Sequence, residues 1–193
     1  VSEYAIRPLD ASTWDAFERL AEKHNGMGFG GCWCTWFHSR VGRPEGLKGR
    51  PWKEQLAREG KAHAALVFDG DDAVAWAQFG SPDELPNIHH RKDYEKTRTQ
   101  ELPDYRITCI FVDRDYRRKG VAGVALRGAV ELIAKAGGGV VEGYPQDTQG
   151  KRISAKFLYN TTRSLYEQTG FDYDRPKGKN HCVMRRTVRP SKR

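Results

Sequence analysis

The stretch that decides the fold is residues 112–126, which read VDRDYRRKGVAGVAL. It follows the apolar, β-branched run Arg106–Val112, which predicts a strand, and it opens Lys119–Ala136, whose apolar residues recur at helical spacing. The first turn of a helix presents unpaired backbone N–H groups and the positive end of the helix dipole, which together bind phosphate. Gly120 lets the backbone approach an anion closely, and the basic run Arg117–Lys119 adds positive charge. We therefore predict that this turn binds a pyrophosphate.

The elements around this turn indicate a mixed sheet. A strand–helix–strand unit formed by Arg106–Val112, Lys119–Ala136 and Val140–Tyr144 implies two parallel strands joined by a right-handed crossover. His63–Phe68 and Ala73–Phe79, separated by the turn sequence DGDD, form a hairpin and therefore an antiparallel pair. The expected fold is α/β of the mixed α+β kind, with a central mixed β-sheet flanked by helices.

The remaining elements follow from the same periodicities and turn signals. They are a strand at Tyr4–Leu9, a helix at Thr13–His24 with Ser12 as its N-cap, a helix at Trp52–Gly60 with Pro51 at its first position, a helix at Thr161–Thr169, and strands at Phe171–Asp174 and Cys182–Arg186. The polar stretch Gly80–Asp104 is long for a plain connector, so a functional role is expected there. With no internal repeat and no convincing linker, residues 1–193 are expected to form one domain with a basic tail from about 187.

Charge and hydropathy narrow the class of protein. Lys and Arg total 33 against 25 Asp and Glu, giving a net charge of +8 and a pI near 9.4. Such a balance favours an anionic partner, either a polyanionic cofactor or nucleic acid, or it describes a generally basic surface. No apolar run approaches the roughly 18 residues that span a membrane, and no signal segment precedes the first strand, so a cytoplasmic location without membrane contact is expected.

Four cysteines are too few for a disulfide scaffold, so reduced thiols are expected. Cys32 and Cys34 form a C-x-C sequence with His38 four residues on, which raises zinc as an alternative. A structural zinc site wants four ligands, usually in two spaced pairs, and no second pair accompanies this one. Buried structural cysteines, with no metal, are the favoured interpretation.

Two signatures resemble those of the GNAT superfamily of N-acetyltransferases. Arg117, Gly120 and Ala122 match its cofactor-binding pattern Q/R-x-x-G-x-G/A, and the match lies between a strand and a long helix, as in that family. Downstream, residues 164–171 read SLYEQTGF, which is similar to the family's L-Y-E-x-x-G-F segment. In order and spacing, the resemblance covers roughly residues 60–186.

The resemblance implies acetyl-CoA as cosubstrate, bound where the two parallel strands splay apart. In the family the pantetheine arm pairs with the strand before the turn, and the backbone amides matching Arg118–Gly123 hold the pyrophosphate. The implied cofactor-binding residues are Ile110, Phe111, Val112, Arg117, Arg118, Lys119, Gly120, Val121, Ala122, Gly123 and Asn160. The family's pantetheine-binding asparagine would fall one residue earlier, at Tyr159, so Asn160 is a displaced match.

The resemblance also implies catalytic roles. Tyr166 matches a tyrosine that often protonates the leaving thiolate, and the alternative is a core aromatic residue. Several relatives carry a catalytic glutamate about where Arg106 stands, and a guanidinium cannot act as a base. Glu84 is the residue we predict as general base; Asp83, His89, His90, Glu142 and a water relay are the alternatives.

The expected function is transfer of an acetyl group from acetyl-CoA to a primary amine of a small molecule, peptide or protein by direct attack. Gly28–Phe37, with Trp33, Trp36 and Phe37, either lines an acceptor pocket or caps the core. Two alternatives remain: a catalytically silent acyl-CoA-binding protein on the same fold, and a basic nucleic-acid-binding module. The latter is less favoured because no helix-turn-helix, zinc finger or RNP-like pattern is present. Since GNAT proteins often form dimers, a homodimer is a candidate assembly.

Overall fold

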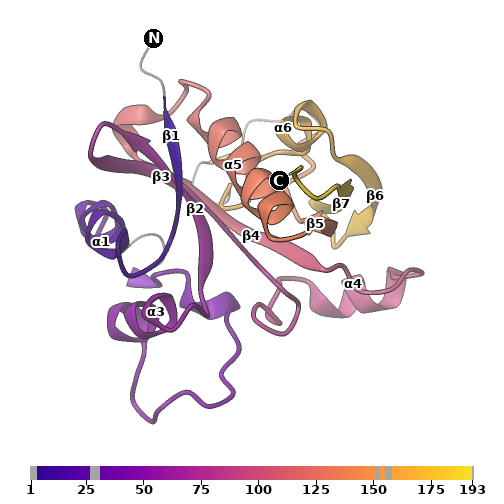
Figure 1. Cartoon of the computed structure of the whole chain (residues 1–193). Helices are drawn as coiled ribbons and strands as arrows, with labels where there is room; N and C mark the ends of the chain where they lie inside the picture. Colours follow the sequence, from indigo (N-terminus) through magenta and orange to yellow (C-terminus); the bar gives the residue numbers. More distant parts are fainter. Residues whose placement is uncertain (1–3, 27–30, 151–152, 155–157, 193) are drawn as a thin grey trace.

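A computed structural model of the chain describes residues 4–26, 31–150, 153–154 and 158–192. Figure 1 shows a central sheet with helices on both sides. The elements are β1 (Ala5–Pro8), α1 (Trp14–Lys23), η1 (Thr35–Phe37, a 3-10 turn), α3 (Gly49–Arg58), β2 (His63–Asp69), β3 (Asp72–Gly80), α4 (Arg91–Thr97), β4 (Tyr105–Val112), η2 (Arg114–Tyr116, a 3-10 turn), α5 (Val121–Lys135), β5 (Gly139–Gly143), α6 (Arg163–Gln168), β6 (Asp172–Lys177) and β7 (His181–Val188).

Among the described residues the sheet has seven strands in the order β1-β2-β3-β4-β5-β7-β6. The predicted hairpin is the antiparallel pair β2–β3, and the predicted crossover joins the parallel pair β4–β5, so the expected mixed sheet is confirmed. The parallel pairing runs only from Tyr105 opposite Val141 to Ile107 opposite Gly143. Because β4 continues to Val112 while β5 ends at Gly143, the two strands part over the second half of β4.

The face of the sheet covered by α5 has a mainly aliphatic core. Leu126 and Ile133 are fully buried among strand residues such as Ile107 and Val141. The helix packs closely at Gly128: a Cβ there would lie 2.9 Å from Cδ1 of Ile6, so the Ile6 side chain would have to shift to admit a larger residue. We call this side of the sheet the α5 face.

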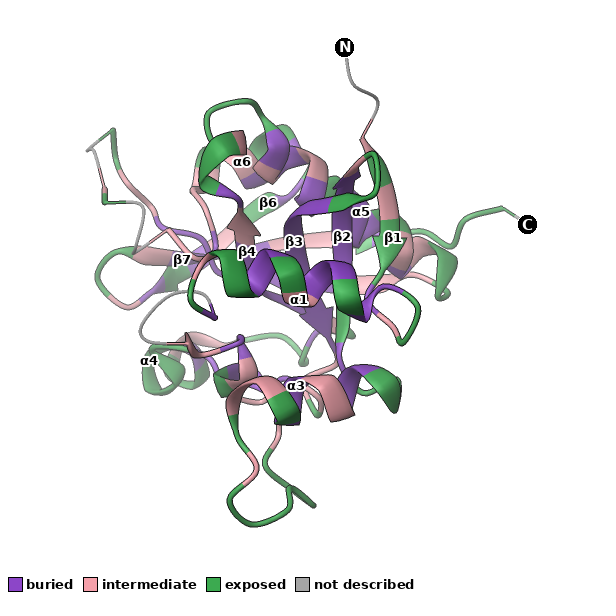
Figure 2. Ribbon diagram, turned by 90° about the vertical axis from the view of Figure 1, so that its left-hand side faces the viewer, coloured by how far each residue is buried: buried purple, intermediate pink, exposed green. Residues whose placement is uncertain are grey.

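The opposite side, here called the aromatic face, is covered by α1 and α3, which lie in front of the sheet in Figure 2. The rings of Phe17 and Trp76 stack with centroids 4.1 Å apart, and Trp33 stacks on Trp14 at 6.3 Å. Aromatic pairs of this kind add stability beyond the burial of their apolar area. The two faces are therefore built from different chemistry, aliphatic on one side and aromatic on the other.

Several predicted boundaries need correction. α1 begins after Thr13, not Ser12, because the Asp10 carboxylate accepts hydrogen bonds from the backbone N–H and the hydroxyl of Ser12 and holds that residue in the preceding turn. α3 begins at Gly49, so Pro51 occupies the third helical position, where its missing N–H still costs nothing.

The polar stretch 80–104 contains the short helix α4. Near the C-terminus, β7 extends through Val188, into the stretch expected to be tail.

Candidate functional site

The turn after β4 is fixed by Asp113. Its backbone N–H donates to Val74 at 2.9 Å, and its carboxylate accepts from the N–H of Asp115 at 3.0 Å and from Nζ of Lys23 at 2.7 Å. His24 lies 3.3 Å from the same carboxylate. The backbone and Lys23 hydrogen bonds hold the pKa of Asp113 below its ordinary value against the burial that raises it. These hydrogen bonds therefore fix the position at which the chain leaves β4 on its way to α5.

Gly120 is the N-cap of α5 and has φ +77°, a left-handed conformation that favours glycine. No atom lies within 4 Å of the place where its Cβ would be, so the space in front of the helix is open. The Gly120 carbonyl accepts from the N–H of Gly123 at 3.0 Å, which closes the first helical turn. The basic side chains flank this opening: Arg117 Nε donates to the Val112 carbonyl at 3.3 Å, and Lys119 lies over the Tyr116 ring.

The predicted site residues on β4, Asn160 and Tyr166 come together where β4 and β5 part. The side-chain amide of Asn160 donates to the Ile107 carbonyl at 3.1 Å, and its oxygen accepts from the Tyr166 hydroxyl at 2.6 Å. The N–H of Ile110 donates to the Tyr159 carbonyl at 2.6 Å. The backbone group expected to face a pantetheine arm thus has a partner within the chain in this structure.

Tyr166 is fully buried, and its ring fills the space that a side chain at position 143 would need. A Cβ on Gly143 would lie 2.1 Å from the ring of Tyr166, while Phe171 packs edge-on at 5.0 Å. Burial raises the pKa of Tyr166 well above its ordinary value, so the phenol keeps its proton at neutral pH. The residue is a core aromatic whose hydroxyl donates a hydrogen bond to Asn160.

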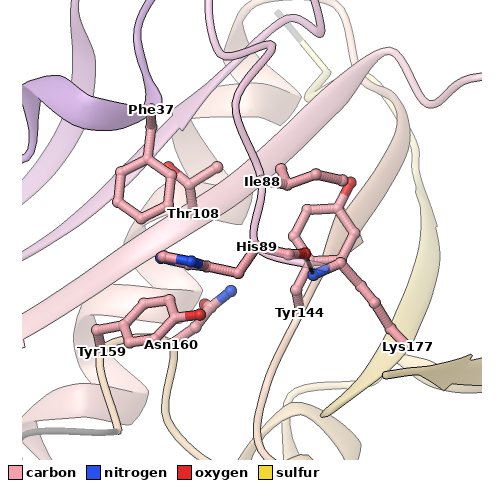
Figure 3. Close-up of a pocket in the computed structure, with 8 residues that line it drawn as sticks. All are labelled: Phe37, Ile88, His89, Thr108, Tyr144, Tyr159, Asn160 and Lys177. Atoms are coloured by element: carbon pink, nitrogen blue, oxygen red, sulfur yellow. Dashed lines mark hydrogen bonds between the residues drawn. The ribbon is translucent and has the colours of Figure 1, made fainter. Parts of the chain in front are cut away.

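A small pocket lies beside this cluster, on the aromatic face. Figure 3 shows the His89 ring between the rings of Phe37 and Tyr159. It stacks on Trp36 with centroids 4.3 Å apart and meets Phe37 edge-on at 6.0 Å. The lining residues are Phe37, Ile88, His89, Thr108, Tyr144, Tyr159, Asn160 and Lys177.

Lys177 is a pocket residue that the sequence did not reveal. Its ammonium group donates to the His89 carbonyl and lies 4.7 Å from the centre of the Tyr144 ring. Burial, together with the charge of Arg106, lowers the pKa of Lys177 to about 7. Burial and the charge of Lys177 also lower the pKa of His89. The pocket therefore contains an imidazole that is neutral at physiological pH, next to an amine that titrates near it.

Glu84, the predicted general base, does not line this pocket. Its carboxylate accepts from the backbone N–H of His63 at 3.1 Å and lies 2.7 Å from Nδ1 of the same residue. It borders a separate hollow together with Phe79 and Leu132. The position of Glu84 serves to pin the end of β3 to the start of β2.

Glu142, another candidate base, is enclosed by hydrogen-bond donors. Its carboxylate accepts from Tyr94 at 2.8 Å, Tyr144 at 3.0 Å and Arg185 at 2.7 Å. Arg106 is buried beside this cluster, donates to the Leu85 carbonyl and lies over the Tyr94 ring. These groups form a buried ionic network that joins β4, β5 and α4. Both carboxylate oxygens of Glu142 accept hydrogen bonds in it.

The aromatic segment divides between core and pocket. Trp33 is buried in the aromatic face, whereas Trp36 is 40% exposed beside His89, and Phe37 lines the pocket. Residues 28–30 of this segment lie outside the described residues. The four cysteines are free thiols, and no group of three or more His, Cys, Asp or Glu in the described part of the chain has the geometry of a metal site.

A mixed sheet that opens between two parallel strands, next to the glycine-capped start of a long helix, defines an N-acetyltransferase fold. The chain matches the acetyltransferase (GNAT) family over residues 29–171 and belongs to it. No helix in the described residues is long and apolar enough to cross a membrane.

Solved structures support the fold. The ribosomal-protein-S18-alanine N-acetyltransferase from Escherichia coli superposes with a TM-score of 0.52 at 12% identity, covering 98% of this chain and 97% of that one. An N-acetyltransferase from Staphylococcus aureus Mu50 gives 0.53 at 9% identity over 96% and 98% of the two chains. A GNAT acetyltransferase from Streptococcus pneumoniae gives 0.52 at 15% identity over 96% and 99%. A search of curated proteins found no match.

Proposed function

We propose that this protein transfers an acetyl group from acetyl-CoA to a primary amine of a small molecule, peptide or protein. One observation carries the proposal: the open, glycine-capped N-terminus of α5 lies at the end of β4, the strand that parts from its parallel neighbour. A helix N-terminus next to a basic run fits a pyrophosphate, and a parting pair of strands leaves the edge of β4 for an extended ligand.

The chain's own groups can hold such a ligand. Backbone amides of residues 118–123 face the pyrophosphate, with charge from Arg117, Arg118 and Lys119 and small residues Ala122 and Gly123 behind them. The edge of β4 at Ile110, Phe111 and Val112 takes the pantetheine arm, and Ile110 then exchanges its Tyr159 carbonyl partner for one on the ligand. Asn160 borders the same edge through its bond to Ile107.

Groups in the pocket and in the cluster beside it supply the acid–base chemistry. His89 is the proposed general base, because it lines the pocket and burial keeps its imidazole neutral at physiological pH. Tyr166 is the proposed proton donor to the departing thiolate, because burial keeps its phenol protonated. A primary ammonium group entering beside Trp36 and Phe37 loses one proton to His89, and the neutral amine that results attacks the thioester carbonyl directly.

Binding is tested first, by calorimetric titration of the parent with acetyl-CoA beside a Gly120→Glu variant. A carboxylate in front of the helix repels the pyrophosphate, so affinity should fall by about a hundredfold or more. Gly137→Glu is the matched control, because Gly137 also has positive φ and open space, at the other end of α5. Failure of the parent to bind acetyl-CoA would rule out the proposed function.

Catalysis is tested by thiol release over a panel of amines. Removing the hydroxyl in Tyr166→Phe, or the base in His89→Gln, should lower kcat by about a hundredfold while the affinity for acetyl-CoA changes little. If the parent binds acetyl-CoA but releases no thiol with any amine, the chain is a silent acyl-CoA-binding protein instead.

A further inference from the structure

Two buried thiols meet on the aromatic face. Sγ of Cys34 lies 3.0 Å from Sγ of Cys109, although the two residues are 75 positions apart in the sequence. Cys34 precedes η1 and Cys109 lies within β4, and both are nearly inaccessible to solvent. A disulfide bond is about 2.0 Å long, so the two sulfur atoms need to approach by only about 1 Å to bond.

Cys32 adds a third, more accessible thiol. It is partly exposed, and its sulfur accepts a hydrogen bond from the backbone N–H of Cys34 at 3.4 Å. Trp33 and Cys34 both have positive φ, which curls the chain so that Cys32 faces the following residues. Hydrogen bonding from Cys34 and the positive charge of Lys53 lower the pKa of Cys32 to about 6, against the burial that raises it. Cys32 is therefore largely a thiolate at neutral pH.

Lys53 is a buried amine whose hydrogen-bond partners are neutral. Its Nζ lies 3.0 Å from Nε2 of His38 and donates to the side-chain carbonyl of Gln78. A buried ammonium needs a nearby negative charge. Burial lowers the pKa of Lys53, and the thiols of Cys34, Cys109 and Cys32 together with the carboxylate of Glu84 oppose that shift. A thiolate in this cluster therefore favours the charged lysine, and the charge of Lys53 in turn lowers the pKa of Cys32.

We propose that Cys32, Cys34 and Cys109 form a peroxide-reactive thiol site, in which oxidation begins at Cys32 and ends as a disulfide between Cys34 and Cys109. The substrate class is a small hydroperoxide, which reaches the partly exposed sulfur first. None of the three cysteines lines the pocket, and the site does not depend on acyl transfer.

The reaction has three steps. The Cys32 thiolate attacks the outer oxygen of the hydroperoxide, which leaves a sulfenic acid and, after protonation, an alcohol, or water when the oxidant is hydrogen peroxide. The Cys34 thiol attacks that sulfur, forms a Cys32–Cys34 disulfide and releases water. The Cys109 sulfur then attacks Cys34, passing its proton to the departing Cys32. In sum, one hydroperoxide takes two electrons from Cys34 and Cys109.

Thiol acidity favours this order. The best leaving thiol in an exchange is the one with the lowest pKa. Hydrogen bonding to Cys109 raises the pKa of Cys34, whereas that of Cys32 is lowered, so Cys32 is the thiol that leaves. The finished bond would fasten the segment that carries Trp36 and Phe37 to β4, one residue before Ile110.

The proposal is tested on the full chain by peptide mapping. The parent is treated with equimolar hydrogen peroxide, the remaining thiols are alkylated, and the digested peptides are identified by mass spectrometry. The expected product joins Cys34 to Cys109, with Cys32 and Cys182 alkylated. Cys182 is the internal reference, because it is buried and its pKa is raised to about 12. A final product that joins Cys32 to Cys34, or equal oxidation of Cys182, overturns the proposal.

Two variants test the relay itself. Cys32→Ser should slow formation of the Cys34–Cys109 bond by about tenfold or more, because no thiolate remains to react first. Cys109→Ser should stop the relay at the Cys32–Cys34 disulfide. Cys182→Ser is the matched control and should form the bond at the parent rate. Formation of the bond at the parent rate in Cys32→Ser contradicts the proposal, provided that thermal melting shows the variant is folded.

Discussion

The two faces of the sheet carry their chemistry in different ways. On the α5 face the residues of the candidate pyrophosphate site are neighbours in sequence. The turn, Gly120 and the helix form one continuous stretch. On the aromatic face the groups that meet come from distant segments, as with Cys34 and Cys109, or with Lys53 and Gln78. A local motif can therefore indicate a candidate ligand site from sequence, whereas clusters of buried polar groups and thiols become visible only in the folded chain.

A second difference concerns titration. The core beneath α5 is mainly aliphatic, while the aromatic face encloses Lys53 and His38. Burial of a titratable group couples folding to pH, and burial of an aliphatic group does not. Substitutions on the two faces should therefore change the free energy of unfolding with a different dependence on pH. Substitutions at Leu126 and His38 test this difference, and one at Lys135 tests the exposed side of α5.

Leu126→Ala removes a fully buried side chain from the α5 face. The free energy of unfolding should fall by about 2–5 kcal/mol, because the lost apolar contact leaves a cavity. Denaturant unfolding should give the same loss at pH 7 and pH 5. Leu132→Ala, at a partly buried position of the same helix, is the control with a smaller loss. A loss of stability in Leu126→Ala that changes strongly with pH would contradict the prediction that this core does not couple folding to pH.

His38→Gln tests the aromatic face. Burial, with the charge of Lys53, lowers the pKa of His38 from 6.5 to about 2. Between these values the unfolded chain binds a proton that the folded chain does not, so stability falls as pH falls. This one residue should cost the parent about 2 kcal/mol between pH 7 and pH 5. In the variant, the acid loss measured by denaturant unfolding should be smaller by that amount.

His63→Gln is the control with the opposite sign. The carboxylate of Glu84 raises the pKa of His63, so this residue adds stability at low pH that is lost as pH rises. Its removal should make the acid loss steeper. Equal acid profiles for the parent and His38→Gln would mean that the buried imidazole does not couple folding to pH.

Lys135→Ala gives the smallest effect. Nζ of Lys135 lies 2.7 Å from the Glu131 carboxylate one helical turn earlier, and both side chains are more than half exposed. Such a pair stabilises a helix by at most about 0.5 kcal/mol and is screened by salt. The difference from the parent should vanish in about 0.5 M salt. Salt screens the attraction between exposed charges, and the screening length, about 10 Å at roughly 0.1 M, is shorter still at this concentration. A larger loss would show that the exposed side of α5 also carries stability.

The sequence was sufficient for features set by local pattern. The hairpin β2–β3, the crossover through α5 and the parallel pair all follow from periodicity and glycine placement. The short helix α4 was not predicted, because it buries little besides Tyr94 and so has no apolar stripe. Its buried side chain, Tyr94, donates a hydrogen bond to the buried carboxylate of Glu142, which is a long-range contact that local pattern does not reveal.

The candidate site divides in the same way. Asn160 and Tyr166 were predicted from the resemblance to the family's segments, and the structure places them within hydrogen-bonding distance. Lys177 was not found, because its burial depends on β6 lying over the loop that carries His89. The prediction of Glu84 as general base rested only on its charge and its position in a loop. Neither feature shows which pocket a carboxylate will line.

The hydrogen bonds of Tyr159 and Asn160 to β4 have a consequence for aggregation. A sheet that opens between two strands creates inner edges, and unpaired edge groups are a template on which another chain can add a strand. Because Ile107 and Ile110 are already bonded to this segment, the inner edge is shielded by the chain itself. Substitutions at residue 160 should therefore raise the tendency of the protein to associate edge to edge.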